Sequence, residues 1–449
     1  EDGIRDWSVT GVQTCALPIY NQPHIAVIGL GFIGLPLSLS YAMHGARVIG
    51  LDVLPGLIQD INSGVTHHLE SYEGRTIRDI LKEQLNNGRF RATSDYHEAS
   101  REVDTYIITV GIPIKDGEPD YRGFDACCST LAGVLKRGDT VIVRSTVVPG
   151  TTEERVLPML ERSGLKAGED FYLAYASERI AEGRAFEEFI SMPLAMGGIN
   201  EASVEKAKQI LSFVTKAEIT VSDIKVVETS KVIENIQRDV NIAMVQQFAR
   251  FAEKVGIDTF ELIKVANTHK RVNLLTPGPG VGGYCLPNAL YYLLPKAREL
   301  GVSIDLLETA RRINDEVPGM LVDMVASGLA KQGKSLDGSR VAVLGLAMKD
   351  FSNDDRISPP HDIVRILGER GAVVKAWDPA VKSEYAYKVD TLEEAVSGAD
   401  ALLYVTVQEE FLSIDWSRVV GLMAENAVMV DTKNRIPRNL PAGVLLYRI

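Results

Sequence analysis

The chain has 449 residues, of which 45% are hydrophobic and 24% are charged, as in an ordinary globular protein with two or three domains. Its formal net charge of −12 argues against nucleic acid or an anionic membrane as a partner, because both reward clustered Lys and Arg. Four cysteines are no disulfide framework, and no Cys/His cluster has zinc spacing, so we expect no metal site and a reducing, cytoplasmic location.

Two segments need separate treatment before the fold is considered. Residues 1–19 lack the basic start and apolar centre of a signal peptide, and their tract VTGVQTCALPI resembles a translated sequencing adapter. We therefore exclude them from the fold. Residues 25–43 carry no charge and could be mistaken for a membrane span, but three spaced glycines and Pro36 favour a strand, a turn and a helix.

Residues 24–53 have the pattern of a dinucleotide-binding unit: a buried strand, a turn, a helix and a second strand. Gly29, Gly31 and Gly34 have the G-x-G-x-x-G spacing, which allows a tight turn, close approach of a pyrophosphate and packing of helix on strand. Asp52 ends the second strand, where a carboxylate would bind the adenosine ribose hydroxyls and repel a 2′-phosphate. We therefore expect NAD rather than NADP; a glycine-rich turn without a nucleotide is the alternative.

Strand-like runs follow at residues 105–110 and 140–144, and the second run ends at Ser145 and Thr146. Ligands bind at the carboxyl ends of parallel strands, so Thr146 is a candidate contact, although a turn or capping role is the simpler interpretation. Cys127 and Cys128 lie in an apparent helix, and we expect both to be buried and inert.

Residues 222–256 have apolar side chains at helical spacing, a Ser/Asp start and a glycine stop. More than 30 residues at 1.5 Å each predict a rod of roughly 50 Å, which usually connects domains or buries a face against another subunit. Lys231 and Asn235 are four residues apart and therefore project from one face. A solvated, salt-bridging face is the alternative for this pair.

The C-terminal third repeats the strand, turn and helix pattern. Strands over 341–345 and 373–377 flank a helix, and Asp378 ends the second strand as an aspartate ended the first copy. The glycine spacing is missing, so we do not expect a second dinucleotide. A nucleotide-shaped pocket with Lys349 and Arg356 near phosphates is expected instead, with a charged surface loop as the alternative.

The order of these motifs is similar to that of the UDP-glucose/GDP-mannose dehydrogenase family, NAD-dependent enzymes that oxidise the C6 alcohol of a nucleotide sugar to a carboxylate. The resemblance runs from about residue 23 to the end and rests on GLGFIGLP, STVVPGTT, ASERIAEG, KVIENIQRDVNIA, RVNLLTPGPGVGGYC and GLAMK…DDRISP. The motifs ERIAEG, ENIQRDVNIA and RVNLLTPGPGVGG look more like the branch acting on UDP-N-acetylhexosamines, such as UDP-N-acetylmannosamine and UDP-N-acetylglucosamine, than the UDP-glucose branch.

Together these features predict an α/β fold with two Rossmann-like doubly wound domains joined by a central helical domain with one long helix. We expect an NAD-binding domain over residues 20–221, a helical dimerisation domain over 222–318 and a UDP-sugar-binding domain over 319–449. The resemblance also implies a homodimer in which Arg271 reaches the sugar nucleotide of the neighbouring subunit.

The resemblance assigns the chemistry to five residues. Cys285 corresponds to the nucleophile that captures an aldehyde as a thiohemiacetal and then carries a thioester, with its thiolate favoured by nearby Lys231 and glycine-loop N–H groups. Lys231 corresponds to the lysine that stabilises the developing oxyanion. Thr146 and Asn235 correspond to the pair that holds the catalytic water, and Glu178 to the carboxylate that activates it.

Two sets of binding residues complete the expected site. The expected cofactor contacts are Gly29, Gly31, Phe32, Ile33, Gly34, Asp52, Val110, Thr146, Lys349 and Arg356. The expected substrate contacts are Glu178, Arg179, Ile180, Lys231, Asn235, Arg271, Gly282 and Lys349.

Ala289 departs from the family pattern, in which an aspartate follows the cysteine by four residues. In addition, VGIP replaces V-P-T-P at residues 110–113, Phe351 stands where an acid is common, and Lys433 replaces an arginine. Three functions stay open: a four-electron UDP-N-acetylhexosamine 6-dehydrogenase, a diverged member with altered or incomplete oxidation, and an inactive NAD- and nucleotide-binding scaffold.

Overall fold

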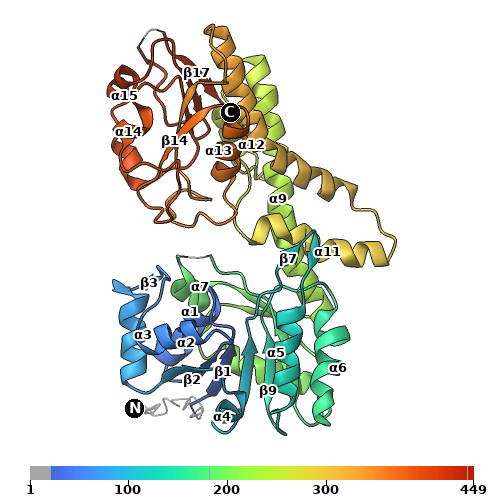
Figure 1. Cartoon of the computed structure of the whole chain (residues 1–449). Coiled ribbons are helices and arrows are strands. Elements are labelled where there is room, and N and C mark those ends of the chain that lie inside the picture. Colours follow the sequence, from blue (N-terminus) through green and yellow to red (C-terminus); the bar gives the residue numbers. More distant parts are fainter. Residues whose placement is uncertain (1–21, 182, 442) are drawn as a thin grey trace, which may run out of the picture. The chain divides into compact units, whose positions relative to one another are not determined.

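The structure is a computed structural model that describes residues 22–181, 183–441 and 443–449. The segment expected to derive from an adapter, residues 1–19, lies outside the described residues. Two compact units are present (Figure 1): the first contains residues up to 112 with 121–146 and 150–228, and the second contains 113–120, 147–149 and 229–449.

The first unit is built on an eight-stranded sheet with the strand order β12-β11-β10-β9-β6-β1-β2-β5. All neighbouring pairs are parallel except β10 with β11. Its strands are β1 (His24–Ile28), β2 (Arg47–Leu51), β5 (Phe90–Thr93), β6 (Thr105–Ile108), β9 (Thr140–Val143), β10 (Tyr172–Ala176), β11 (Leu194–Gly198) and β12 (Ile219–Val221), with a hairpin of β3 (Ser71–Tyr72) and β4 (Arg75–Thr76).

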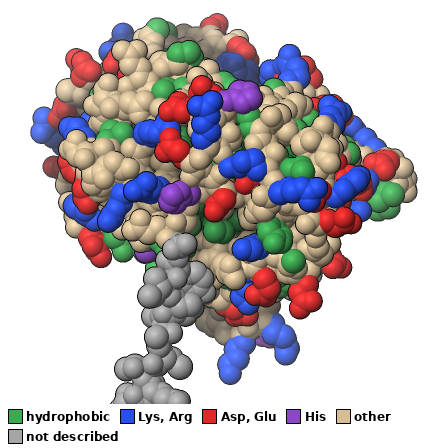
Figure 2. Space-filling view, turned by 90° about the horizontal axis from the view of Figure 1, so that it is seen from below, with side chains coloured by type: hydrophobic (Ala, Val, Ile, Leu, Met, Phe, Trp, Pro, Cys, Tyr) green, Lys and Arg blue, Asp and Glu red, His purple; other side chains and the backbone are tan. Residues whose placement is uncertain are grey.

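Helices accompany this sheet, and α1, α3 and α7 lie next to one another beside it (Figure 1). The helices of the first unit are α1 (Gly34–Met43), α2 (Pro55–Asn62), α3 (Ile77–Asn86), α4 (Tyr96–Ser100), α5 (Arg122–Ala132), the π-turn η1 (Thr152–Val156), α6 (Leu157–Leu160), the 3₁₀ turn η2 (Glu161–Ser163), α7 (Ala185–Ser191) and α8 (Glu201–Leu211). Over the face seen in Figure 2, acidic and basic side chains are interspersed rather than gathered by sign.

The central strands of this sheet are buried along their whole length, which suits their apolar sequences. Every residue of β6 and β9 is buried, as expected where helices cover both faces of a parallel sheet. Strand β1 lies between β2 and β6, so the chain leaves it to one side and returns on the other. This reversal is a topological switch point, where ligands of doubly wound sheets bind. The turn after β1, with its three glycines, lies at this point.

The long helix is confirmed as α9 (Ile224–Val255), which has 32 residues. Gly256 ends it with a φ of +78°, a left-handed conformation that glycine adopts without strain. At 1.5 Å per residue the helix is about 48 Å long. The predicted stop signal and helical periodicity therefore located this element to within two residues at each end.

The second unit is built on a five-stranded parallel sheet with the order β14-β13-β15-β16-β17. Alternate residues of β13 enter different cores: Val341 and Val343 pack with α12 and α13, and Ala342 and Leu344 with α14 and α15. Its strands are β13 (Arg340–Leu344), β14 (Val373–Trp377), β15 (Ala401–Tyr404), β16 (Val428–Asp431) and β17 (Leu445–Arg448), with the hairpin β7 (Ile114–Lys115) and β8 (Glu118–Pro119).

The helices of this unit are α10 (Thr259–Ala266), α11 (Cys285–Glu299), α12 (Asp305–Lys331), α13 (Pro359–Glu369), α14 (Leu392–Val396), the 3₁₀ turn η3 (Glu409–Ser413) and α15 (Trp416–Leu422). The α/β class is confirmed, with a Rossmann-like sheet, a helical centre around α9 and a C-terminal parallel sheet. The proposed boundary at residue 319 falls inside α12, which continues through Pro318, and the three-domain division stays a prediction. Among the described residues, no helix is both long and apolar enough for a membrane span, and residues 25–43 fold as β1, a turn, and α1.

Candidate active site

The turn after β1 has the shape that a dinucleotide requires. Gly29 has a φ of +93° and donates its N–H to the carbonyl of Leu51, which ties the turn to β2. A Cβ on Gly34 would overlap the Gly29 carbonyl oxygen, whereas a Cβ on Gly31 would meet nothing within 4 Å. Gly34 therefore allows close packing of α1, and Gly31 leaves open space over the backbone for a pyrophosphate.

Helix α1 begins directly at this turn, with Phe32 and Ile33 immediately before it. The Ile33 cap makes no side-chain hydrogen bond, and the first turn holds no acidic residue. A helix N-terminus of this kind favours an anion, because its N–H groups and the helix dipole both carry partial positive charge. Val110 lies beside Gly29, since a Cβ on that glycine would be 3.1 Å from the Val110 nitrogen.

Asp52 follows β2 and joins this turn through its carboxylate. Its Oδ2 accepts the Leu30 N–H at 2.8 Å and its Oδ1 accepts the Leu54 N–H at 3.1 Å. The side chain stays partly exposed at the switch point. These residues fit a bound NAD: the turn and α1 would hold the pyrophosphate, and Asp52 the ribose, while NAD would supply a hydride acceptor.

The C-terminal sheet repeats this hydrogen-bond pattern. Gly345 donates its N–H to Trp377 as Gly29 does to Leu51, and Asp378 Oδ2 accepts the N–H of Leu346 at 2.7 Å. Unlike the partly exposed Asp52, Asp378 is buried, and both of its oxygens also accept from Gln408 Nε2 at 3.1 Å. Its acceptors are thus occupied by the protein, and the absence of a second dinucleotide stays a prediction.

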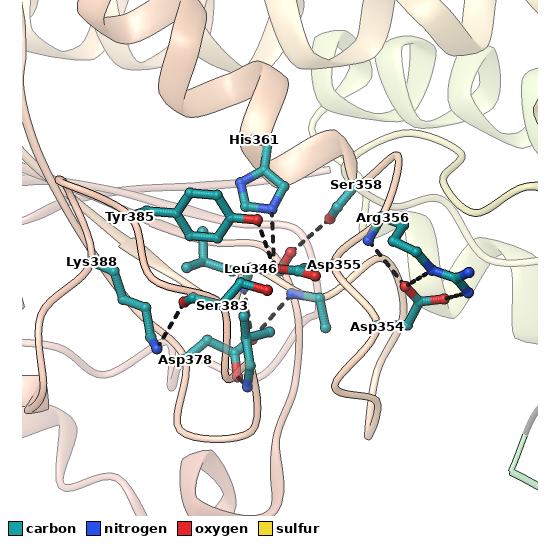
Figure 3. A network of polar contacts seen from close by, with 12 residues as sticks. Leu346, Asp354, Asp355, Arg356, Ser358, His361, Asp378, Ser383, Tyr385 and Lys388 are labelled. Atoms are coloured by element: carbon teal, nitrogen blue, oxygen red, sulfur yellow. Dashed lines mark hydrogen bonds and ion pairs between the residues drawn. The ribbon is translucent and has the colours of Figure 1, made fainter. Parts of the chain in front are cut away.

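The segment between β13 and α13, residues 346–358, is called the nucleotide loop below (Figure 3). Arg356 makes a two-point ion pair with Asp354, with Nε to Oδ1 at 2.8 Å and Nη2 to Oδ2 at 2.7 Å. Burial raises the pKa of Asp354, but the hydrogen bonds and charge of Arg356 outweigh burial and lower it overall. Lys349 and Arg356 are both exposed on this loop, where a diphosphate could reach them.

Two departures from the family pattern also lie on or beside this loop. Phe351 is exposed and has a φ of +55°, an uncommon conformation for a residue with a side chain. Lys433 pairs through Nζ with Asp350 Oδ1 at 2.8 Å. The lysine thus keeps a charge contact to the loop without the two-point geometry that an arginine would offer.

Cys285 is the first residue of α11, and its side chain is exposed. The other described cysteines, Cys127 and Cys128, are buried as predicted, and a hydrogen bond from Cys127 together with burial raises the pKa of the Cys128 thiol. The first turn of α11 contains no acidic residue. A sulfur at this position lies at the N-terminal end of α11, and the N-terminal end of a helix interacts favourably with negative charge. Ala289, one turn later, is buried, and Gly282 lies in the loop before Cys285.

Lys231 and Asn235 project from one face of α9, as their spacing predicts. Asn235 is buried and Lys231 is partly buried, which argues against a fully solvated face. Arg271 is exposed in the segment between α10 and α11. These three residues belong to the second unit, with Cys285, Gly282, Lys349 and Arg356.

Glu178 follows β10 in the first unit and has a partner that the sequence did not suggest. Arg144, at the end of the neighbouring strand β9, forms a buried ion pair with it. Glu178 Oε1 also accepts the N–H groups of Arg179 at 2.7 Å and Ile180 at 3.0 Å. The carboxylate is therefore fixed in orientation by a charge and two backbone donors.

The remaining predicted residues are also in the first unit. Thr146 is partly buried, three residues after β9, at the same edge of the sheet as Glu178. Arg179 donates through Nη1 to the Pro193 carbonyl at 3.1 Å, and Ile180 packs on the core under α1 and α7. Thr146, Glu178 and the NAD turn thus share the carboxyl edge of one sheet.

Comparison with known proteins identifies the family of the chain. Residues 23–214, 225–316 and 342–438 match, in order, the NAD binding, central and UDP binding domains of the UDP-glucose/GDP-mannose dehydrogenase family. A UDP-N-acetyl-D-mannosamine dehydrogenase from Pyrococcus horikoshii is 37% identical over 425 residues, which cover 95% of this chain and 98% of that protein. The chain belongs to the UDP-glucose/GDP-mannose dehydrogenase family. It is an oxidoreductase of that family, and its first sheet is the NAD binding domain.

Solved structures of family members are similar over nearly the whole chain. The UDP-D-ManNAc dehydrogenase from P. horikoshii has a TM-score of 0.87 and covers 95% of this chain and 98% of its own. The UDP-N-acetyl-mannosamine dehydrogenase from Staphylococcus aureus has a TM-score of 0.82 at 31% identity, with 94% and 97% covered. A UDP-N-acetyl-D-glucosamine 6-dehydrogenase from Salmonella typhi is 33% identical over 429 residues, covering 93% and 97%.

Proposed function

We propose that the chain oxidises the C6 alcohol of a UDP-N-acetylhexosamine, with UDP-N-acetylmannosamine favoured, to a uronate in two NAD-dependent steps. Relatives named as UDP-N-acetylmannosamine dehydrogenases cover nearly the whole chain, which supports this sugar class. The observation that carries the proposal is the exposed thiol of Cys285 at the start of α11, in a chain whose other two described cysteines are buried.

The proposed chemistry depends on covalent capture by Cys285. The thiolate attacks the C6 carbonyl of the aldehyde and forms a C–S bond, while the Lys231 ammonium stabilises the oxygen that becomes negative. NAD accepts the hydride in each of the two oxidations. Water attacks the resulting thioester, which releases the uronate and restores the thiol, and the family pattern assigns the holding of this water to Thr146 and Asn235. Because the thiol must stay reduced, a cytoplasmic location is favoured.

Glu178 is proposed to take the proton from that water. Its ion pair with Arg144 and its two backbone hydrogen bonds keep one rotamer in place, so the carboxylate does not need to reorganise during the reaction. We therefore propose Arg144 as a positioning residue for Glu178. Both residues lie just beyond the carboxyl ends of the neighbouring parallel strands β9 and β10, and this strand pairing brings them together.

Counting the NADH formed per sugar tests this function. Purified protein is given a limiting amount of UDP-N-acetylmannosamine, UDP-N-acetylglucosamine or UDP-glucose, and absorbance is read at the NADH band. We expect two NADH per UDP-N-acetylmannosamine and slower reaction with the other two sugars. If none of the three sugars yields NADH, the remaining function is that of an inactive scaffold that binds NAD and a nucleotide.

One observation favours a second function, oxidation that stops at the aldehyde. Ala289 is buried and carries no carboxylate one turn after Cys285, so the late steps lack a group that the family pattern supplies. This diverged enzyme would form one NADH per sugar. Trapping the product with a hydrazine reagent would then give an aldehyde adduct in place of a uronate.

We also propose a homodimer formed through α9. Ile233, Met244, Phe248 and Phe251 are 39–63% exposed. Met244, Phe248 and Phe251 are four and three residues apart, and Ile233 lies about three helical turns before Met244, so the four form one stripe of α9. A hollow of about 430 Å³ next to the stripe is lined by further apolar side chains from α11 and α12, Leu293 and Leu307. An exposed apolar stripe of this length is typical of a subunit interface, and it supports the expectation that Arg271 serves a neighbouring subunit.

Light scattering on Phe251→Glu tests the dimer. We expect the variant to be a monomer at micromolar concentration, because a carboxylate would be buried without a partner in the interface. Val265→Glu is the matched control, since Val265 is similarly exposed but lies on a different helix, α10. A dimer that persists in Phe251→Glu would place the interface elsewhere.

A further inference from the structure

Two loops of the second unit are in direct contact. The glycine loop, residues 278–283, leads into Cys285, and the nucleotide loop carries Lys349 and Arg356. Gly283 donates its N–H to the carbonyl of Ile357 at 3.0 Å. This hydrogen bond joins a residue two positions before the proposed nucleophile to the residue directly after Arg356.

The contact leaves no room for a side chain at Gly282. A Cβ on Gly282 would lie 2.8 Å from the Ile357 oxygen, 2.7 Å from Pro359 Cδ and 3.0 Å from Met348 Cβ. A Cβ on Gly283 would lie 2.5 Å from Met348 Sδ. At the start of the same loop, a Cβ on Gly278 would meet nothing within 4 Å. Gly282 is therefore required by the backbone and the proline ring of the neighbouring loop, whereas a side chain on Gly283 would displace only the end of Met348 and Gly278 is unconstrained.

Ile357 is held in a conformation that its side chain disfavours. Its φ is +48°, in the left-handed region, which is a genuine outlier for a β-branched residue. Its side chain is 55% exposed, so burial of the isoleucine does not hold it there. Strained residues of this kind persist when surrounding contacts fix them, and they cluster at functional sites.

Contacts on both sides of Ile357 supply that constraint (Figure 3). On one side Arg356 is clamped to Asp354, and on the other the buried Ser358 donates through Oγ to the Leu346 carbonyl at 2.7 Å. Tyr385 donates its O–H to Asp355 Oδ2 at 2.8 Å. These contacts hold the nucleotide loop in one conformation, and in that conformation the carbonyl of Ile357 accepts the hydrogen bond from the glycine loop.

We propose that Ile357 is a positioning residue that couples occupancy of the nucleotide loop to the position of the Cys285 thiol. A diphosphate at Lys349 and Arg356 would compete with the Asp354 carboxylate for the guanidinium and draw Arg356 away from it, and Ile357 follows because it is the next residue. The Gly283 hydrogen bond then transmits that change to the start of α11. The inference rests on the proposed function for the role of Cys285, but its test does not require turnover.

The test measures how fast iodoacetamide alkylates Cys285 with and without UDP, followed by mass spectrometry of the peptides. UDP alone is the probe because it occupies the UDP binding domain without a sugar at the thiol. Cys127 and Cys128 are buried and serve as internal controls for unfolding. In the unmodified protein we expect UDP to change the rate by about fivefold or more, the lower end of ordinary coupling between sites.

Two glycine variants separate coupling from direct shielding of the thiol. Gly282→Ala wedges the loops apart, and we expect it to bind UDP, by calorimetry, with Cys285 alkylation no longer responding. Gly278→Ala should keep the full response. If Gly282→Ala keeps the response, UDP shields the thiol directly and the proposal is wrong. Absence of UDP binding, or of any response in the unmodified protein, overturns it as well.

Variants of Ile357 test the carbonyl itself. Ile357→Gly retains the carbonyl and adopts a positive φ freely, so we expect the UDP response to survive. Ile357→Pro cannot adopt that φ, and we expect the response to be lost. With substrate, the proline variant should lower kcat more than it raises KM, since the nucleotide contacts remain. Loss of response in the glycine variant would assign the coupling to the side chain instead. If Ile357→Pro does not fold, Gly282→Ala decides alone.

Discussion

Cys285 and Ala289 lie one turn apart on α11, yet the cysteine side chain is exposed and the alanine is only 2% exposed. Helix α11 packs on β8 and α12, and the alanine lies on the packed side. The position that carries an aspartate in the family pattern is therefore secluded from water. A carboxylate there would act strongly on its neighbours, because buried charges are poorly screened.

Ala289→Asp should raise turnover. A buried carboxylate stays ionised only with a partner, and in the proposed site Lys231 is that partner. We expect a gain of about 10²-fold, the lower end of what a positioned proton acceptor contributes. A comparison with Ala289→Asn, whose side chain has the same size as aspartate and no charge, isolates the effect of the carboxylate. A slower but folded Ala289→Asp enzyme would mean that another group already fills the role.

Cys285→Ser should separate the two oxidations. The hydroxyl cannot form a thioester, so we expect at most one NADH per active site in a rapid-mixing experiment and no steady turnover. In the unmodified enzyme, mass spectrometry after rapid quench should detect an acyl adduct on Cys285, because Ala289 slows hydrolysis. Full turnover by the serine variant would exclude covalent catalysis through this residue.

Asp52→Asn should weaken NAD by about tenfold or more, since hydrogen bonds to a charged group contribute ~1.5–3 kcal/mol, and should bring NADP closer in affinity. Titration with both cofactors measures this ratio. Asp378→Asn is the matched control, because it changes the equivalent aspartate of the C-terminal sheet. That variant should lower Tm and leave the NAD to NADP ratio unchanged. Equal affinity for the two cofactors in the unmodified protein contradicts the assignment of Asp52.

His361 should make the protein less stable in mild acid. Burial lowers its pKa below 6.5, although the carboxylates of Asp355, Asp362 and Asp378 oppose that shift. The unfolded chain therefore binds the proton more tightly, and stability is lost as pH falls through about 6.5. The ring lies between the Tyr387 hydroxyl, 2.7 Å from Nδ1, and Asp355 Oδ2, 3.8 Å from Nε2.

Denaturant unfolding of His361→Asn at pH 5 and pH 7 measures this contribution. The amide can replace Nδ1 in the hydrogen bond to Tyr387 and cannot be protonated in this range. We expect the variant to lose less stability than the parent between the two pH values, by up to ~1.4 kcal/mol for each unit of pKa difference. An identical pH dependence in both proteins would show that protonation of His361 costs nothing.

The parts of the fold that depend on local pattern were predictable from the sequence. The glycine spacing fixed the turn after β1, because the required backbone shape belongs to Gly29 and Gly34 themselves. The stop at Gly256 and the apolar periodicity located α9. The aspartate at the end of each second strand was also visible in the sequence, whereas its hydrogen bonds to the N–H groups of Leu30 and Leu346 come from the structure.

The parts that depend on packing between distant segments were not predictable in the same way. The sequence predicts a domain boundary next to Pro318, yet α12 continues through this proline, because the helix is buried along one face and packing there offsets the lost hydrogen bond. Glu178 was assigned without its Arg144 partner, which is 34 residues away. The left-handed conformation of Ile357 had no sequence signal at all, since it is imposed by its neighbours.

The contact between Gly283 and Ile357 has a consequence for recombining this chain with its relatives. A crossover at residue 319 would precede the last sheet, but it would pair one parent's glycine loop with another parent's nucleotide loop. The two loops must fit each other at Gly282, because the Ile357 carbonyl oxygen and the Pro359 ring occupy the space that a side chain on Gly282 would need. Exchange of sugar-nucleotide specificity should therefore transfer residues 278–359 as one inherited block.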